Sequence, residues 1–226
     1  MRCAGRALIL HLVTDRRRLA AGQNGAAVHG CLLEQLQYAV DAAVDVVQIR
    51  ERDLDAADLL SLVRDAVDIA QSSSTRIVVN DRLDVALSSG AAGVHLRGDG
   101  IPPKIVRSHV PRGFLVGRSV HSRDEAVLHG AHVDYLIAGT VWDTASKAGA
   151  TALGRAGLAE IVRAVEVPVL AIGGVEAHRF RDIAESGAAG AAAVGLFIAG
   201  PARMGCGAMP LTNIVKEART QFRGER

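Results

Sequence analysis

The sequence predicts an α/β protein that folds as a single-domain (β/α)8 TIM barrel, and three observations carry this prediction. Eight short apolar runs alternate with longer segments of helical period, as in repeated βα units around a parallel sheet. Val, Ile, Leu and Ala dominate the runs, which is typical of parallel strands covered on both faces. The chain has 226 residues, 49% of them hydrophobic, and no linker or low-complexity segment divides it. We therefore expect one domain spanning 1–226.

The apolar runs predict the strands in chain order, at residues 7–13, 46–50, 76–80, 93–96, 114–119, 134–139, 168–174 and 190–197. After the second run, Leu59, Leu60, Val63, Val67 and Ile69 recur near helical spacing, which predicts an amphipathic helix. The C-terminal segment, about 210–226, contains the amphipathic stretch "LTNIVKEART" and is the candidate final helix. A doubly wound open sheet is the competing fold, but it favours a GxGxxG loop that "TDRRRLAAGQNG" lacks.

Composition and charge exclude several classes of function. A formal net charge of +2 gives no basic footprint for nucleic acid, and no window is long and apolar enough to span a membrane. The N-terminal apolar run is broken by His11 and followed by Asp15 and three arginines, unlike a signal peptide. Cys3, Cys31 and Cys206 are too few and scattered for a disulfide framework, so we expect free thiols. These features favour a soluble cytoplasmic protein and leave a homo-oligomer possible.

Polar side chains concentrate where the predicted strands end. In a barrel of this kind the chemistry takes place at the carboxyl ends of the strands, so these residues are expected to share one rim. The rim has an excess of positive charge. The candidates are Gln48, Arg50, Arg52, Asn80, Asp81, Ser119, His121, Thr140, Thr144 and Lys147.

Glycines at the ends of the last two strands indicate a phosphate site. Gly173, Gly174 and Gly195 would let backbone N–H groups approach an anion closely, with Leu196 next to them. The alternative for Gly173 and Gly174 is a tight turn with no ligand. The presence of Gly195 and Lys147 on the same rim favours phosphate binding.

His121 is the candidate proton-transfer residue. It follows the fifth strand, on a rim expected to hold an anionic ligand, and imidazole is suited to moving protons near neutral pH. The alternative is a surface histidine preceding a helix that Ser122 caps. His11 is expected to point into the barrel interior, whereas His95 is as compatible with packing as with function.

Two further pairs of residues have two interpretations each. Arg50 and Arg52 would face the same way and suit a phosphate or carboxylate, or would form ion pairs with Glu51 or Asp53. Asn80 and Asp81 could hold magnesium, or Asp81 could cap the following helix.

Several motifs together resemble the thiamine phosphate synthase superfamily. They are "QIRER", "VNDRLDVAL", "GVHL", "GRSVHSRDEAV", "DYLIAGTVWDTASK" and "PVLAIGGV", and the resemblance runs from "LVTD" to "AVGLF". The stretches "IRER…AADLL" and "GRSVHS" are more similar to the thiazole tautomerase (TenI) branch.

Departures from the synthase pattern separate the branches of this superfamily. Arg52 stands where the synthases have lysine, and Gly100 stands where they have a magnesium-binding aspartate, although Asp99 is adjacent. Without that aspartate, a diphosphate leaving group is harder to stabilise with a metal. Asp81 and Thr140, in contrast, look more like the synthases.

The resemblance implies two enzymatic functions. We expect a thiazole tautomerase without a cofactor, in which His121 transfers the proton that aromatises a carboxythiazole phosphate. The phosphate would lie on Gly174 and Gly195, with Lys147 near the ligand and Arg50 on the carboxylate. The alternative is thiamine phosphate synthase, with Asp81 helping to hold Mg²⁺. A non-catalytic thiazole- or thiamine-phosphate-binding protein is the third interpretation.

Overall fold

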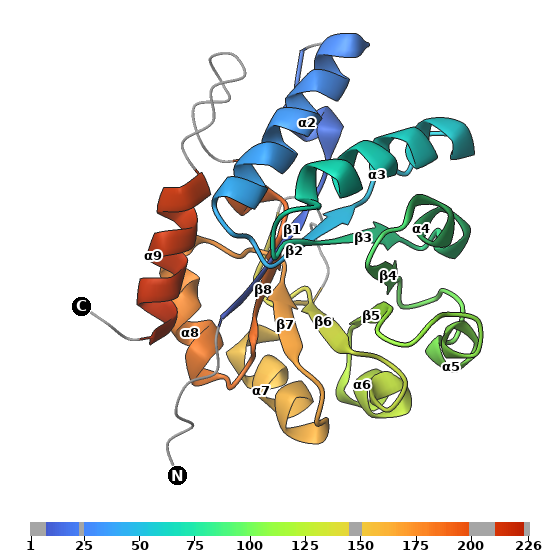
Figure 1. Ribbon diagram of the computed structural model, residues 1–226. Helices are drawn as coiled ribbons and strands as arrows, with labels where there is room; N and C mark the ends of the chain where they lie inside the picture. The colour runs from blue at the N-terminus through green and yellow to red at the C-terminus, as the bar shows by residue number, and fades with distance from the viewer. Residues whose placement is uncertain (1–7, 23–24, 145–150, 199–210, 224–226) are drawn as a thin grey trace.

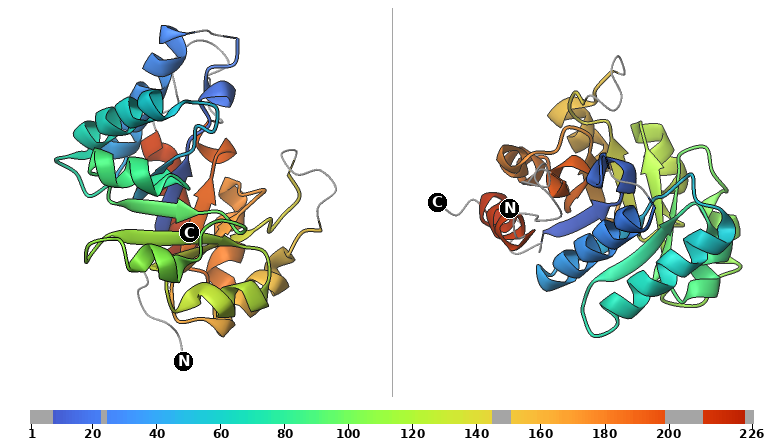
Figure 2. Two further views of the ribbon diagram at one scale, coloured as in Figure 1. Left: turned by 90° about the vertical axis from the view of Figure 1, so that its right-hand side faces the viewer. Right: turned by 90° about the horizontal axis from the view of Figure 1, so that it is seen from above.

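The fold is a closed barrel of eight parallel strands that pair in chain order, β1 to β8, with β8 hydrogen-bonded to β1 (Figure 1). The computed structural model describes residues 8–22, 25–144, 151–198 and 211–223. Figure 2 shows helices outside the strands on successive sides of the barrel. The predicted (β/α)8 fold is therefore confirmed.

The strands are β1 (Ile9–Val13), β2 (Val46–Ile49), β3 (Arg76–Asn80), β4 (Gly93–Leu96), β5 (Leu115–Val120), β6 (Tyr135–Gly139), β7 (Val169–Ile172) and β8 (Gly190–Ala193). The helices are α1 (Arg16–Leu19), α2 (Ala26–Asp41), α3 (Ala56–Ala70), α4 (Leu83–Ser89), α5 (Pro103–Arg107), α6 (Arg123–Gly130), α7 (Gly154–Ala164), α8 (Phe180–Glu185) and α9 (Leu211–Arg223). Two 3-10 turns are η2 (Ala177–Arg179) and η3 (Gly195–Phe197).

Alternation along each strand divides the core into two layers. In β1, Leu10 and Leu12 belong to the large cluster between the strands and the helices, whereas Val13 belongs to a smaller cluster inside the barrel. Both faces of the strands are thus buried, which explains their nearly continuous apolar sequence. The inner cluster contains Val13, Tyr135, Ile137, Leu170, Ala189 and Ala192.

Helix α3 shows how local sequence produces these elements. The Asp55 carboxylate accepts a hydrogen bond of 2.9 Å from the backbone N–H of Asp58 and so caps the helix N-terminus. Leu59 and Val63 are buried on the face that meets the barrel. Leu60 and Val67 are only partly buried, so the buried face of the helix is narrower than the apolar stripe that the sequence predicts.

The candidate final helix is confirmed as α9. Leu211, Val215 and Ala218 are buried on one side, and Figure 1 shows the helix between α2 and α8, which it contacts. Arg219 donates a hydrogen bond of 2.9 Å to the carbonyl of Ala43 and ties the helix to the end of α2.

The second predicted strand ends one residue early, at Ile49, and two others end two or more residues early at glycines. The seventh strand ends at Ile172 because Gly173 and Gly174 have φ angles of 94° and 64°, which turn the chain out of the sheet. The eighth ends at Ala193, and Gly195–Phe197 forms η3 instead of continuing the strand. The glycine-rich ends of both strands are therefore turns at the rim.

Two other expectations are tested by the structure. Cys31 is disulfide-bonded, so the expectation of free thiols is wrong for this residue. Among the helices within the described ranges, none combines the length and apolar character needed to cross a membrane.

Candidate active site

A chain of hydrogen bonds crosses the barrel interior at the carboxyl ends of the first three strands. His11 Nε2 lies 3.1 Å from Gln48 Oε1, and Gln48 Nε2 donates to Asn80 Oδ1 at 2.8 Å. Asn80 Nδ2 in turn donates to Asp81 Oδ2 at 3.0 Å. The structure thus brings the predicted residues Gln48, Asn80 and Asp81 together, and it confirms that His11 points inward. Burial lowers the pKa of His11 to about 3, so this imidazole is neutral at pH 7.

His95 links the barrel interior to the predicted site residue Ser119. Its Nε2 lies 2.9 Å from Ser119 Oγ, and its Nδ1 lies 3.3 Å from the Tyr135 hydroxyl. The ring also stacks on Tyr135, with centroids 5.6 Å apart. Burial lowers the pKa of His95 well below its usual value. His95 is therefore a packed residue that also holds a polar group of the site.

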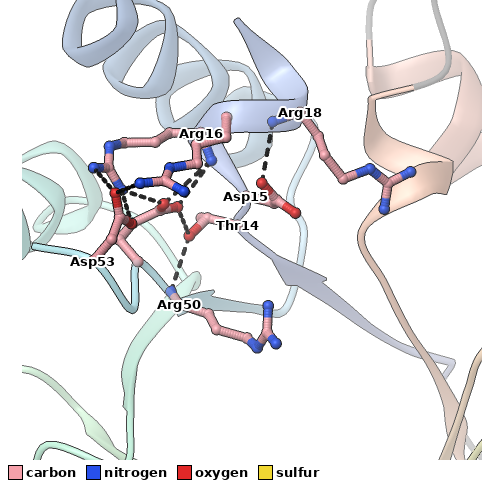
Figure 3. A network of polar contacts seen from close by, with 8 residues as sticks. Thr14, Asp15, Arg16, Arg18, Arg50 and Asp53 are labelled. Carbon is pink, nitrogen blue, oxygen red and sulfur yellow. Dashed lines mark hydrogen bonds and ion pairs between the residues drawn. The ribbon is translucent and has the colours of Figure 1, made fainter. Parts of the chain in front are cut away.

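A second polar network lies beside β2 and supports Arg50 (Figure 3). The Thr14 hydroxyl donates to the buried carboxylate of Glu51 at 2.6 Å and accepts the backbone N–H of Arg50 at 2.9 Å. Arg16 bonds Glu51 at 3.0 Å and Asp53 at 2.6 Å, and it lowers the pKa of Asp53 to about 2. The network fixes the backbone where β2 ends.

Within the described residues, Arg50 forms no ion pair. Arg16 bonds Glu51 and shares Asp53 with Arg17, while Asp15, Glu51 and Asp81 attract the Arg50 guanidinium without contacting it. Figure 3 shows the Arg50 side chain extending away from Asp53. Burial is the main cause that lowers the pKa of this half-buried guanidinium, followed by repulsion from Arg52. The expected alternative, in which Glu51 or Asp53 pairs with Arg50 or Arg52, is therefore wrong.

Asp81 organises the loop that follows β4. Its Oδ1 accepts the backbone N–H of Arg97 at 2.8 Å, while α4 has no side-chain cap, so the expected capping role is wrong. Asp99 is 82% exposed and bonds Arg97 Nε at 2.9 Å. Position 100 is glycine, and a Cβ there would lie 3.4 Å from Asp81 Oδ1.

These observations test the magnesium site that the resemblance implies. The second carboxylate beside Asp81 is missing, and Asp99 faces solvent in an ion pair. In the described part of the chain, no group of three or more His, Cys, Asp or Glu residues has an arrangement that could hold a metal. The residues present do not fit a magnesium site built on two carboxylates.

His121 lies on the rim between the ends of β4 and β6. Its Nδ1 hydrogen-bonds the carbonyl of Gly139, and its ring edge faces Gly98. Ser122 caps α6 by accepting the N–H of Glu125 at 3.2 Å, as the alternative interpretation expected. His121 is thus both a rim residue and the residue that precedes a capped helix.

The predicted glycines differ in their surroundings. A Cβ on Gly173 would lie 2.5 Å from Thr140 Cγ2, and one on Gly174 would lie 2.7 Å from Trp142 Cβ. These two glycines therefore allow the segment after β6 to pack closely. A Cβ on Gly195 would meet only Arg18 Nη2, at 3.6 Å. Gly195 is the more open of the three positions, and a guanidinium lies beside it.

Arg18 is a rim residue beside Gly195 that sequence reasoning missed. Its backbone N–H bonds Asp15 at 3.1 Å, and Figure 3 shows its side chain extending away from Asp53. The available signal was its position, since "TDRRR" follows the first strand directly and α1 lies on the rim. Of the remaining predicted residues, Thr140, Thr144 and Leu196 are partly buried, and Lys147 lies outside the described residues.

The fold and the site together define a (β/α)8 barrel with cationic and amide side chains around the carboxyl ends of its strands, an arrangement suited to phosphorylated small molecules. Comparison with known proteins identifies the family within this class. The family model for thiamine monophosphate synthase matches residues 10–197, so the chain belongs to that family.

Individual relatives agree with this assignment. A putative thiamine-phosphate synthase of Geobacter sulfurreducens is 36% identical over 196 residues, which cover 85% of this chain and 87% of the relative. A thiamine-phosphate synthase of Methanoculleus marisnigri is 39% identical over 160 residues, covering 70% and 76%. The solved thiamine phosphate pyrophosphorylase from Pyrococcus furiosus has a TM-score of 0.77 and 26% identity, covering 97% of this chain and 98% of that one.

These findings correct the function expected from the sequence. The relatives are described as synthases, so the expectation of a thiazole tautomerase is contradicted, and the stated alternative is the better supported one. The resemblance to the superfamily itself is confirmed. The tautomerase expectation relied on Gly100 and on short motifs, which do not outweigh similarity along most of the barrel.

Proposed function

We propose that this protein is a thiamine-phosphate synthase, which joins a thiazole phosphate to a pyrimidine that carries a diphosphate. The observation that carries the proposal is the half-buried guanidinium of Arg50, which forms no ion pair with any described carboxylate and lies near Arg52 just after β2. A partly desolvated, unpaired arginine is a favourable site for a phosphate oxygen. The similarity to synthases along the whole barrel supports the same conclusion.

The reaction in this proposal is a substitution at the methylene group of the pyrimidine. The lone pair of the thiazole nitrogen forms the new C–N bond, the C–O bond to the diphosphate breaks, and the diphosphate leaves with that electron pair. Arg50 and Arg52 would stabilise the negative charge that develops on the leaving group. No step is assigned to Mg²⁺, because the residues present do not fit the two-carboxylate site.

The amide chain is suited to hold the pyrimidine. Gln48 has a second N–H that is not used in the chain from His11 to Asp81, and Ser119 presents a hydroxyl anchored by His95. Such groups can read the nitrogen atoms of a heterocycle at the mouth of the barrel. Asn80 would orient Gln48 and contact the ligand from β3.

The thiazole phosphate would lie on the opposite side of the rim. Gly195 and Leu196 would offer backbone N–H groups at the start of η3, and Arg18 would add a charge beside them. In the proposal, this side is completed by Gly173, Gly174, Thr140 and Thr144. His121 has no proton-transfer role in a synthase, and we assign it to holding the ends of β4 and β6 in place.

The test is a synthase assay on the purified chain with both substrates over a range of magnesium concentrations. Thiamine phosphate and diphosphate should appear in equal amounts. Arg50→Gln should lower kcat/KM by about 100-fold, the loss typical of removing one preorganised charge-stabilising group. Arg64→Gln, which changes an exposed arginine on α3, should leave the rate unchanged. Absence of product at every magnesium concentration would refute the proposal, and ligand binding without turnover would point to a non-catalytic protein.

A further inference from the structure

We propose that Arg97 is a diphosphate-binding residue that supplies, from the chain itself, positive charge at the place where the second magnesium-binding carboxylate is missing. This inference rests on the proposed synthase function. It predicts that the protein binds a diphosphate without a divalent cation.

Arg97 is anchored by Asp81 and Asp99. Its backbone N–H donates to Asp81 Oδ1 at 2.8 Å, and its Nε lies 2.9 Å from Asp99 Oδ1 and 3.9 Å from Asp81 Oδ2. Among the described residues, the side chain meets Asp99 and Asp81 through Nε, and no hydrogen bond occupies its two Nη groups. The side chain is 60% exposed, so a ligand can reach these donors.

Gly100 leaves room for the Arg97 side chain. A Cβ at position 100 would lie 3.3 Å from Arg97 Cγ and 3.1 Å from the Arg97 carbonyl. An aspartate there would therefore press on the arginine side chain, and its carboxylate would lie near Asp81. The glycine leaves the space to Arg97. Compared with the synthase pattern, this loop lacks the carboxylate at position 100 that would attract a metal. It carries instead the guanidinium of Arg97, which attracts the anion directly.

The loop that carries Arg97 is rigid. Arg118 on β5 is buried, and it donates to the carbonyl of Ile101 at 3.0 Å and to the carbonyl of Gly98 at 2.5 Å. The N–H of Gly100 bonds the carbonyl of Arg97 at 3.0 Å. Because the loop is held from both sides, little freedom is lost when Arg97 binds a ligand.

Arg97 lies on the same rim as Arg50 and Arg52. Strands β2, β3 and β4 are neighbours in the barrel, and the residues that follow their ends include Arg50 and Arg52, Asp81, and Arg97 respectively. Three guanidinium groups thus follow adjacent strand ends, and the carboxylates beside Arg97 are those of Asp81 and Asp99. A diphosphate carries several negative charges, and its oxygen atoms can accept hydrogen bonds from more than one guanidinium.

The experiment is calorimetric titration of the full chain with inorganic diphosphate in EDTA. The unmodified protein should bind, and Arg97→Gln should bind at least about tenfold more weakly, the loss expected for one charge-assisted hydrogen bond. Arg181→Gln, which changes an exposed arginine on α8, should have no effect. No binding by the unmodified protein in EDTA, or equal affinity in Arg97→Gln, would overturn the inference.

A second variant tests the exchange itself. The double change Arg97→Gly and Gly100→Asp should lose diphosphate binding in EDTA and regain it with Mg²⁺. It should also bind Mn²⁺ in an electron paramagnetic resonance titration more tightly than the unmodified protein does. A double variant that folds, as judged by circular dichroism, and still binds diphosphate in EDTA would contradict the inference. The synthase assay with excess magnesium tests the proposed function separately, because it does not require Arg97 to replace a metal ligand.

Discussion

Gln48 Nε2 donates to Asn80 Oδ1, and this is the middle bond of the chain that runs from His11 to Asp81. The Asp81 carboxylate only accepts, so Asn80 must turn its N–H groups towards it and its oxygen towards Gln48. Gln48 then turns its oxygen towards His11, whose Nε2 carries the proton. The buried Nδ1 of His11 is left as an acceptor without a partner among the described residues.

The first prediction concerns this chain. Gln48→Leu removes both of its hydrogen bonds and leaves His11 and Asn80 unsatisfied, so it should destabilise the fold by about 1–3 kcal/mol. It should also raise KM for the pyrimidine diphosphate more than KM for the thiazole phosphate. Urea unfolding and steady-state kinetics measure the two effects. Gln37→Leu, at an exposed position on α2, is the control and should change neither quantity. Equal effects on both KM values would place Gln48 outside the pyrimidine subsite.

The second prediction concerns Arg18, which lies beside Gly195. Arg18→Ala should raise KM for the thiazole phosphate about tenfold with little change in kcat, because the phosphate does not react. The neighbouring Arg17 is 74% exposed and pairs with Asp53, so Arg17→Ala serves as the control. A kinetic assay at saturating pyrimidine diphosphate measures the difference. An unchanged KM in Arg18→Ala would remove Arg18 from the phosphate site.

The third prediction concerns the dependence of stability on pH. Burial lowers the pKa of His11 to about 3. As the pH falls through 6.5, the unfolded chain therefore binds a proton that the folded chain does not bind. The resulting stability is present above pH 6.5 and is lost as the pH falls from there towards 3. His11 alone should therefore reduce the free energy of unfolding by about 2 kcal/mol between pH 8 and pH 5.

Denaturant unfolding at the two pH values measures this loss. His11→Gln should show a smaller loss than the unmodified protein, because glutamine does not titrate. His29→Gln, at an exposed position on α2, should retain the full loss. Identical pH profiles for all three proteins would contradict the assignment to His11.

The fourth prediction concerns Gly117 in the barrel interior. A Cβ at this position would lie 2.1 Å from the ring of Tyr135, so Gly117→Ala should destabilise the protein by about 1–3 kcal/mol through overpacking. Gly30, on α2, has no atom within 4 Å of such a Cβ, and Gly30→Ala should stabilise the helix by up to about 1 kcal/mol. Thermal unfolding measures both changes. Stabilisation by Gly117→Ala would show that the barrel interior is less tightly packed than the structure indicates.

The barrel was predictable because its signal is local and repeated. Each strand is a short run such as "VVQI", and a residue's position within the run decides whether it faces the helices or the interior. The strand ends were less predictable at Gly173 and Gly195, because a glycine is compatible with a strand, a turn or a 3-10 helix. The set of rim residues followed from the strand positions, and the structure places Gln48 in hydrogen-bonded contact with Asn80, and Ser119 with His95.

The sequence by itself determined the barrel, the order of its strands and the rim on which the polar residues lie, since these depend on periodicity along the chain. Only the tertiary structure decided which charges pair. Arg16 binds the carboxylates of Glu51 and Asp53 and leaves Arg50 without an ion pair among the described residues, and Arg97 lies against Asp81 from the next strand. The physical reason is that ion pairing depends on the distance between groups in space, and arginines on the same rim compete for few carboxylates. Proximity along the chain does not decide that competition.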